Sequence, residues 1–288
     1  MKRKVSFLFF TPAVLLYFVF VIFPIFFGFY ISLSDINGIT SSFKFTGFDN
    51  YGTIFSDNRF WNSIKVTTIF TLLTAVAQNV FSLLFAFLLE IQIKKWQKNV
   101  IRVFLFLPTV MTPLIVGYIW YYIYKIGLPS IFSTLGLKSL SNFIWLGEDF
   151  TLYSVVISTV WLHMGTSLII YIASLTGIDE EIRKASSIDG ATGLKRIIYV
   201  DLPLMIPALL INTVLSVIDG FKQFDQIYSM TKGGPGTATE TMSLLIYQKA
   251  FFSNQAGYGA AASYVLFFIV MILAVIIVTL FRTREVEA

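Results

Sequence analysis

Six long runs without a charged residue constrain the fold of this chain more than any other feature. A helix needs about 20 apolar residues to cross the hydrocarbon core of a bilayer. Backbone groups in lipid must be satisfied within the chain, so spanning runs without strand-like alternation are helices. The sequence therefore predicts an all-α membrane protein with one transmembrane domain over residues 1–288. Its six spans are expected at approximately residues 6–33, 66–89, 103–124, 151–176, 203–220 and 259–281.

The composition excludes several classes of protein. The chain is 56% hydrophobic and 13% charged, whereas soluble domains carry about 25% charged residues. It has no cysteine and one histidine, which rules out a disulfide framework and a thiolate or multi-histidine metal site. The carboxylates are confined to loops and span ends, so no catalytic constellation can be assembled. We therefore expect a protein that is not an enzyme, with no cofactor, no metal and no nucleic-acid partner.

The distribution of basic residues sets the expected orientation. Loops on the cytoplasmic side of a membrane carry an excess of Lys and Arg. Placing the N-terminus inside puts more than half of the 21 basic residues in cytoplasmic segments. These are Lys2, Arg3, Lys4, Lys94, Lys95, Lys98, Arg102, Arg183, Lys184, Lys195, Arg196, Arg282 and Arg284. Both termini and the loop between spans four and five are thus expected in the cytoplasm.

That loop, residues 179–203, is a polar insert in a mostly apolar chain. Its core reads KASSIDGATGLKRIIYVDLPL, and acidic residues open it. Acidic residues favour a helix N-terminus, so a short helix is expected from Asp179 to Ser187. Asp189-Gly190 is a turn signal, and a second helix is expected from Thr192 to Asp201. Such a hairpin could rest on lipid headgroups as an amphipathic element, or it could dock a cytoplasmic protein.

Several motifs carry a resemblance to a known family. The insert contains Lys184-Ala185-Ser186, then Asp189-Gly190-Ala191, then Leu202-Pro203. This series resembles the cytoplasmic signature loop, Glu-Ala-Ala then Asp-Gly-Ala then Leu-Pro, of binding-protein-dependent ABC importer permeases. GFDNYGTIF from Gly47, FDQIYSMTKGGPGTATETMSLLIYQKAF from Phe224 and GYGAAASYVLFFI from Gly257 are similar to segments of the carbohydrate permeases. The chain thus resembles permeases of the multiple-sugar, glycerol-phosphate and lactose type over nearly its whole length.

The resemblance implies a function and a set of partners. It implies a transmembrane subunit of an ATP-driven importer in a bacterial inner, or plasma, membrane. This subunit would form half of the pathway for a sugar or related solute. The implied partners are a second permease in a heterodimer, two cytoplasmic ATPase subunits and an extracellular or periplasmic solute-binding protein, besides membrane lipid. The implied ATPase-coupling residues are Glu181, Lys184, Ala185, Ser186, Asp189, Gly190, Ala191, Leu202 and Pro203.

Two positions depart from the family pattern. Lys184 stands where the family has Glu, and Ser186 stands where it has the second Ala. A family Glu would pair with a basic residue of the ATPase, which Lys184 would repel. Either the partner differs or Glu180 or Glu181 supplies the negative charge.

The chain contains no nucleotide-binding loop of its own. No G-x-x-x-x-G-K-[ST] pattern occurs, and Gly190-Ala-Thr-Gly193 has too few residues between its glycines. Gly233-Gly234-Pro235-Gly236 is typical of a turn. ATP hydrolysis is therefore expected on partner subunits, with the hairpin as their contact.

Polar side chains within the spans are candidates for the translocation path. Polar groups in a membrane face a bundle interior or a cavity, although they also hydrogen-bond between helices. Asn212, Ser216 and Asp219 recur at helical spacing on one face of span five. Tyr118 of span three could offer an aromatic surface to a sugar ring. The predicted path residues are Asn212, Ser216, Asp219, Tyr118, Gln78 and Asn79, with His163 of span four assigned to interhelical packing or the path.

Two alternative functions follow from the same chain. A self-sufficient ion-coupled secondary transporter would need buried coupling groups, and the spans hold one His and no deep carboxylate. A membrane scaffold without transport activity would not need the polar face of span five for solute uptake.

Overall fold

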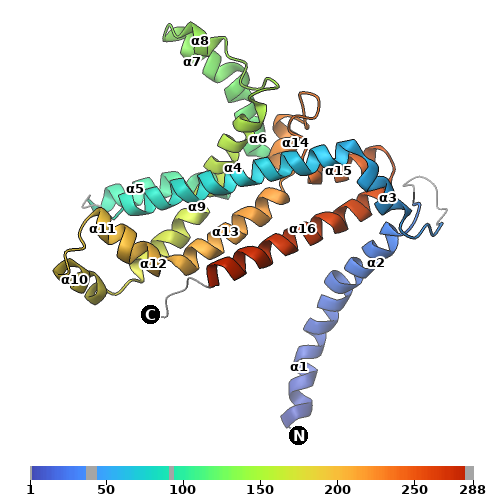
Figure 1. Ribbon diagram of the computed structural model, residues 1–288, viewed down its shortest axis with the longest axis horizontal. Helices are drawn as coiled ribbons and strands as arrows, with labels where there is room; N and C mark the ends of the chain where they lie inside the picture. The colour runs from blue at the N-terminus through green and yellow to red at the C-terminus, as the bar shows by residue number, and fades with distance from the viewer. Residues whose placement is uncertain (1, 37–43, 91–93, 283–288) are drawn as a thin grey trace. The chain divides into compact units, whose positions relative to one another are not determined.

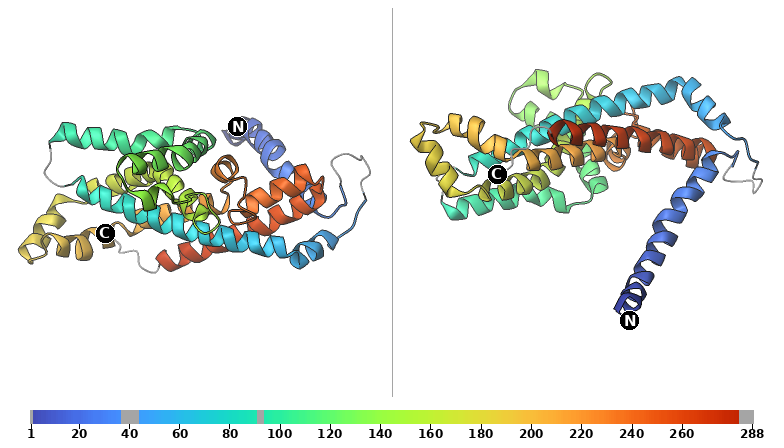
Figure 2. Two further views of the ribbon diagram at one scale, coloured as in Figure 1. Left: turned by 90° about the horizontal axis from the view of Figure 1, so that it is seen from above. Right: turned by 60° about the horizontal axis from the view of Figure 1, so that its bottom comes forward.

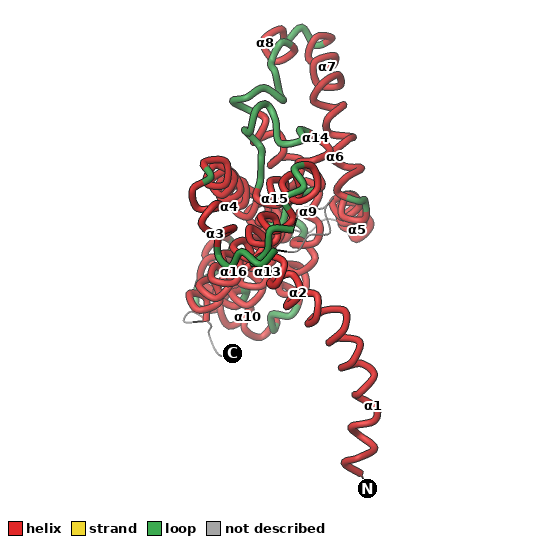
Figure 3. The backbone as a smooth tube through the Cα atoms, turned by 90° about the vertical axis from the view of Figure 1, so that its right-hand side faces the viewer, coloured by secondary structure: helices red, strands yellow, loops and turns green. Residues whose placement is uncertain are grey.

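The computed structural model describes residues 2–36, 44–90 and 94–282. Over these ranges the secondary structure consists of helices joined by turns and loops, with no strand and one isolated β-bridge between Ser34 and Phe45. Figure 3 shows helices joined by loops. The predicted all-α fold class is confirmed, whereas Met1 and residues 283–288, the ends assigned to the cytoplasm, lie outside the described ranges.

Candidate membrane spans can be recognised by length and composition. Among the described residues four helical segments are long and apolar enough, namely Phe10–Ser32, Asn58–Glu90, Thr151–Thr176 and Ala256–Phe281. Two further segments qualify only as bent pairs, and counting each pair as one span gives up to six. In the most apolar stretch of Phe10–Ser32 no residue is buried, whereas 61% of the most apolar stretch of Thr151–Thr176 is buried. Among the described residues the first segment is therefore left with an exposed apolar surface, which needs an apolar surrounding.

The structure differs from the expectation of a continuous helix over residues 103–124. α5 (Lys95–Phe106) passes into the 3₁₀ turn η2 (Leu107–Val110), and α6 (Pro113–Tyr122) starts after a bend of 103°. Thr112 is extended, with φ −68° and ψ 138°. Proline has no backbone N–H and disfavours the helical region for the residue before it, so Pro113 accounts for the break.

The segment over residues 203–220 is also broken. The bend is 70°, between Leu194–Leu204 and Ile206–Phe221. Met205 ends the short α12 (Leu202–Leu204) and directly precedes α13 (Ile206–Phe221). Pro207 lies in the first turn of α13, where its missing N–H would have no helical partner in any case.

The chain divides into two compact units, the first being residues 1–61 with 245–268. This unit contains α1 (Lys2–Tyr17), η1 (Phe18–Ile22), α2 (Phe23–Ser32), α3 (Asp49–Ser56), η5 (Gln248–Phe252), the start of α4 (Asn58–Leu88), the end of α15 (Met242–Tyr247) and the start of α16 (Ala256–Arg282). Asn50 donates from Nδ2 to the carbonyl oxygens of Ser32 and Ser34, 2.9 Å away in each case. These bonds tie the end of α2 to α3.

A charged cluster lies where α3 meets α4 in the first unit. The Asp57 carboxylate lies 3.1 Å from Nζ of Lys249 and accepts a hydrogen bond from the Tyr258 hydroxyl at 2.9 Å. It also accepts from the backbone N–H of Arg59. Burial acts to raise the pKa of Asp57, but the hydrogen bonds from Lys249, Arg59 and Tyr258 outweigh it and hold the pKa below its ordinary value of 3.8.

The second unit comprises residues 62–244 with 269–288. It contains the rest of α4, α15 and α16 and the elements α5, η2, α6, α12 and α13 described above. Its other elements are η3 (Ile123–Gly127), α7 (Leu128–Thr134), α8 (Lys138–Ser141), α9 (Thr151–Thr176), α10 (Glu180–Ile188), α11 (Leu194–Arg196), η4 (Ile197–Asp201) and α14 (Asp225–Met230). α9 packs against α5, α6, α13 and α14, which makes it the central helix of this unit.

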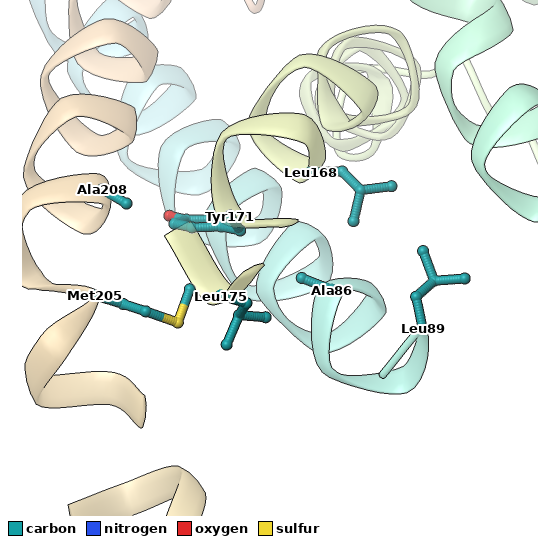
Figure 4. Close-up of a cluster of buried hydrophobic side chains, with 7 residues drawn as sticks. All are labelled: Ala86, Leu89, Leu168, Tyr171, Leu175, Met205 and Ala208. Atoms are coloured by element: carbon teal, nitrogen blue, oxygen red, sulfur yellow. The ribbon is translucent and has the colours of Figure 1, made fainter. Parts of the chain in front are cut away.

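A buried apolar cluster joins three helices of the second unit, as Figure 4 shows. Its members are Ala86 and Leu89 near the end of α4, Leu168, Tyr171 and Leu175 on α9, and Met205 and Ala208 at the start of α13. In lipid, helices associate through close van der Waals packing and hydrogen bonds because lipid is as apolar as the side chains. This cluster therefore holds the ends of α4 and α9 against the start of α13.

The polar insert lies beside that cluster. Figures 1 and 2 show α10, α11 and α12 at the end of the second unit where α4 ends and α5 begins. α6, α7 and α8 extend away from α4, α9 and α13 of the same unit. The insert and the α6–α8 arm are thus separate parts of this unit.

Candidate functional site

The first helix of the insert is closed at both ends by local chemistry. Asp179 is the N-cap of α10 and accepts a hydrogen bond from the backbone N–H of Glu181 at 2.9 Å. At the other end, Ala191 N–H donates to the Ser186 carbonyl at 2.8 Å and Gly190 N–H donates to the Ser187 carbonyl at 3.2 Å. This pair of bonds is a Schellman motif, and it needs the φ of +80° that Gly190 adopts.

The return arm starts at a second glycine. Gly193 has φ 56° and ψ −127°, a region that residues with a side chain rarely occupy. α11, η4 and α12 follow without interruption, and Pro203 lies in the first turn of α12. The insert is therefore a helix–turn–helix hairpin, close to the one predicted from Asp179 to Asp201.

The hairpin presents apolar side chains to its surroundings. The most exposed of these are Ile188 (87%), Leu194 (75%) and Tyr199 (73%). These three residues are not among the coupling residues predicted from the sequence, although apolar residues within a charged loop were a usable signal. A polar hairpin with an exposed apolar tip is suited to contact another protein.

The predicted coupling residues fall into three groups by exposure. Glu181, Lys184, Ala185, Asp189 and Gly190 are exposed, Ala191, Leu202 and Pro203 are half-buried, and Ser186 is buried. Lys184 Nζ lies 3.4 Å from a carboxylate oxygen of Glu180, one helical turn away, with both side chains exposed. Such a pair contributes little stability, but it places a negative charge beside the lysine that replaces the family's glutamate.

A cluster of four charges underlies the hairpin, and sequence reasoning missed it. Its members are Glu90, which follows α4, Arg183 on α10, Arg196 on α11 and Asp201 at the end of η4. The Glu90 carboxylate lies 2.8 Å from Arg183 and 3.2 Å from Arg196. Asp201 lies 3.1 Å from Arg196 through Oδ2 and 3.4 Å from Arg183 through Oδ1. Each arginine thus contacts both carboxylates, and the Asp201 side chain is fully buried.

Four of the six predicted path residues lie in the interfaces between α4, α9 and α13. Gln78 donates to the Ser167 hydroxyl at 2.8 Å, and Asn212 donates to the Ser167 carbonyl at 3.2 Å. Asn79 donates to the Ser216 hydroxyl at 3.1 Å and accepts from the Tyr171 hydroxyl. Gln78, Asn212 and Ser216 are buried and Asn79 is half-buried, so this chain already satisfies their polar groups.

The other two predicted path residues are placed differently. Asp219 near the end of α13 and Tyr118 on α6 are exposed. His163 on α9 is half-buried. The structure therefore does not bring the six residues into one surface.

Known proteins give strong matches to this chain. A family model described as a binding-protein-dependent transport system inner membrane component matches residues 78–285. The chain is 34% identical over 285 residues to a probable starch degradation products transport system permease protein, AmyD, of Thermoanaerobacterium thermosulfurigenes, covering 97% of this chain and 94% of that protein. It is 32% identical over 268 residues to a multiple sugar-binding transport system permease protein, MsmF, of Streptococcus mutans, covering 93% of this chain and 92% of that protein.

A solved structure has the same fold. It is the crystal structure of a bacterial ABC transporter involved in the import of the acidic polysaccharide alginate. The TM-score is 0.84 at 17% sequence identity, covering 98% of this chain and 96% of the matched chain. A second structure of an alginate ABC transporter, in complex with an alginate pentasaccharide-bound periplasmic protein, gives a TM-score of 0.82 at 17% identity, covering 96% of this chain and 93% of the matched chain.

Proposed function

The chain belongs to the family of binding-protein-dependent transport system inner membrane components, and from this premise we infer how it works. It is a multi-pass, non-catalytic permease subunit of an ATP-driven sugar importer, and ATP is hydrolysed on a separate subunit. The alternative of a self-sufficient ion-coupled carrier is not favoured, because the relatives are components of importers that use a binding protein.

We propose the finer assembly as follows. The six apolar segments each cross the bacterial inner membrane, with both chain ends and the hairpin in the cytoplasm. The chain pairs with a second permease, and this heterodimer binds two ATPase subunits and receives solute from an external binding protein. The apolar face of Phe10–Ser32, which this chain leaves exposed, is then covered by lipid or by the second permease.

We propose that the solute is a mono- or oligosaccharide. This follows from the relatives, whose names give multiple sugars, starch degradation products and, for a permease of Thermococcus litoralis that is 31% identical to this chain, trehalose and maltose. Much of the specificity would belong to the binding protein, which is a different chain.

The observation that carries the coupling role is the exposed apolar tip of the hairpin. Ile188, Leu194 and Tyr199 protrude from a hairpin that caps, turn and ion pairs hold in one shape. Their burial in a groove of an ATPase subunit would remove apolar surface from water, which is worth about 1.5–3 kcal/mol for each large side chain. The charges around them would set orientation rather than affinity.

The test is association with the ATPase subunits. Ile188→Ser and Leu194→Ser should reduce co-purification of the ATPase subunits and solute uptake, because both residues lie on the exposed tip. The matched control is Ile144→Ser, since Ile144 is 74% exposed but lies next to the α6–α8 arm. Full ATPase association in both hairpin variants would refute the coupling role.

We propose that the two exposed path candidates contact the solute. Asp219 and Tyr118 can offer a carboxylate and an aromatic face to a sugar, whereas Asn79, Asn212 and Ser216 hold helices together. Asp219→Asn and Tyr118→Ala should lower solute uptake while ATPase association stays unchanged. If neither changes uptake, the path does not run along these residues.

A further inference from the structure

The four-charge cluster of Glu90, Arg183, Arg196 and Asp201, here called the clasp, has an organisation beyond that of surface ion pairs. Two positive and two negative groups alternate, and each arginine bridges two carboxylates. The Asp201 side chain is fully buried, and the other three are between 22% and 32% exposed. A buried carboxylate is stable only when it is paired, and Asp201 accepts a hydrogen bond from Arg196 through Oδ2, whereas its Oδ1 forms an ion pair but no hydrogen bond with Arg183 Nε.

The clasp connects segments that lie far apart in the sequence. Glu90 follows α4 and is 106 residues from Arg196. Arg183 also donates from Nη2 to the carbonyl oxygen of Leu175, in the last turn of α9, at 3.1 Å. Carbonyl groups in the last turn of a helix have no helical partner and attract cations. Arg183 therefore contacts the end of α4, the end of α9 and the segment that leads into α13.

The clasp also lies next to the apolar cluster of Figure 4. Leu89 precedes Glu90, and Leu175 supplies the carbonyl group to Arg183. Met205 donates its backbone N–H to the Asp201 carbonyl at 3.0 Å. Thus the same three helices are joined by apolar packing and by the clasp, which includes both arms of the hairpin.

We propose that Glu90, Arg183, Arg196 and Asp201 are positioning residues that make the hairpin and the adjoining ends of α4, α9 and α13 one rigid body. A displacement of the hairpin is then passed to all three helices together, instead of being absorbed by bending of the loop. The two exposed charges Lys184 and Glu180 lie outside the clasp, because among the described residues they pair with each other within α10. The proposal rests on the proposed function, since it takes the hairpin as the contact with the ATPase subunits.

The rigidity can be measured on the purified chain without any partner. The chain has no cysteine, so Ser187→Cys on α10 and Leu84→Cys on α4, both exposed, give a clean pair of spin labels. The distance between the labels should be narrowly distributed, and Glu90→Gln should broaden the distribution. Glu180→Gln is the matched control, because it removes one carboxylate from the same hairpin outside the clasp. A parent distribution as broad as that of Glu90→Gln would overturn the proposal.

The consequence for transport is measured in vesicles with the whole importer. Glu90→Gln should leave ATPase co-purification unchanged, because the apolar tip is intact, and should lower the solute transported per ATP hydrolysed by about tenfold, as expected for the loss of charge-assisted hydrogen bonds. Glu148→Gln, which removes an exposed carboxylate outside the hairpin, should match the parent protein. If Glu90→Gln transports as much per ATP as Glu148→Gln, the clasp has no role in transmission, even if the hairpin binds the ATPase.

A covalent cross-link in place of the Glu90–Arg196 ion pair distinguishes a positioning role of the clasp from a simple loss of protein stability. The double variant Glu90→Cys, Arg196→Cys leaves Arg183 and Asp201 as a balanced pair, and a short bismaleimide can link the two cysteines. Solute transported per ATP should be low before linking and should recover after it. A linked protein that stays uncoupled overturns the proposal. Failure of the parent chain to bind ATPase subunits would instead overturn the proposed function, and the spin-label distances would still decide the clasp.

Discussion

The two glycines of the hairpin allow a prediction whose size follows from the backbone alone. Gly190 has φ +80° and Gly193 has φ +56°, and a Cβ at either position would meet no atom within 4 Å. An alanine there would therefore cost only backbone strain, about 1–2 kcal/mol for the left-handed region at Gly190. At Gly193, whose ψ is −127°, the cost is about 1–3 kcal/mol.

These costs convert directly into a loss of partner binding. If the hairpin must keep its shape to dock, a strain of about 1–2 kcal/mol reduces the docking-competent fraction or the affinity by about 5- to 30-fold. The assay is a titration of the ATPase subunit onto the purified permease complex. We expect weaker binding for Gly190→Ala and for Gly193→Ala than for the parent protein.

Two further variants make the reasoning easy to refute. Gly136→Ala carries the same kind of strain, with φ +72° and open space around the Cβ, but it lies on the α6–α8 arm, so it should leave ATPase binding unchanged. Asn tolerates the left-handed region, so Gly190→Asn should recover much of the affinity, whereas Gly193→Asn should not. Equal losses for Gly136→Ala and Gly190→Ala, or no recovery in the Gly190→Asn variant, would show that the turn geometry does not control docking.

Three further predictions concern other parts of the molecule. Gly165→Ala should lower the thermal unfolding midpoint measured by intrinsic fluorescence, because a Cβ there would lie 2.6 Å from a backbone carbonyl oxygen of the segment packed on α9. The pKa of Asp57 is held below 3.8 in the folded protein, so its ion pair with Lys249 contributes stability that is fully present above pH 3.8. This stability is lost as the pH falls through the lower pKa of the folded state. Hydrogen exchange around α3 should therefore rise at that acidic pH, and Asp57→Asn should remove the pH dependence. Ser216→Leu should reduce the stability of the purified chain, because it deletes the hydroxyl that accepts from Asn79 and places a larger side chain in a buried interface; a Ser216→Leu variant as stable as the parent but without uptake would point to solute contact instead.

The sequence predicted those parts of the fold that local chemistry determines. α9 occupies the same residues as the fourth expected span, because an uncharged run between two acidic groups marks its ends. The hairpin was expected from an acidic opening and Asp189-Gly190, and the structure has an N-cap at Asp179 and a Schellman motif at Gly190. The bend before Pro113 was not expected, since hydropathy alone does not distinguish a straight helix from one broken by proline.

The clasp could not be predicted for a different physical reason. Arg183, Arg196 and Asp201 are close in sequence, but Glu90 comes from a distant loop, and only the packing of α4 against α9 brings it near. In the sequence these arginines contributed only to the charge bias of cytoplasmic loops. Likewise the amides of α4 and α13 were recognised as polar groups in apolar helices, but their partners depend on helix rotation, which periodicity does not specify.

The hairpin combines a charge-paired, buried base with an exposed apolar tip. At its base, Asp201 is fully buried between two arginines, and removal of one partner of such a pair typically costs about 3–5 kcal/mol. At its tip, Ile188 and Leu194 are largely exposed and contribute little to the fold of this chain. The free energy that resists deformation is therefore concentrated where the hairpin joins α4, α9 and α13. If the hairpin is the contact with the ATPase subunits, as proposed, a displacement of its tip moves these helix ends before it bends the hairpin.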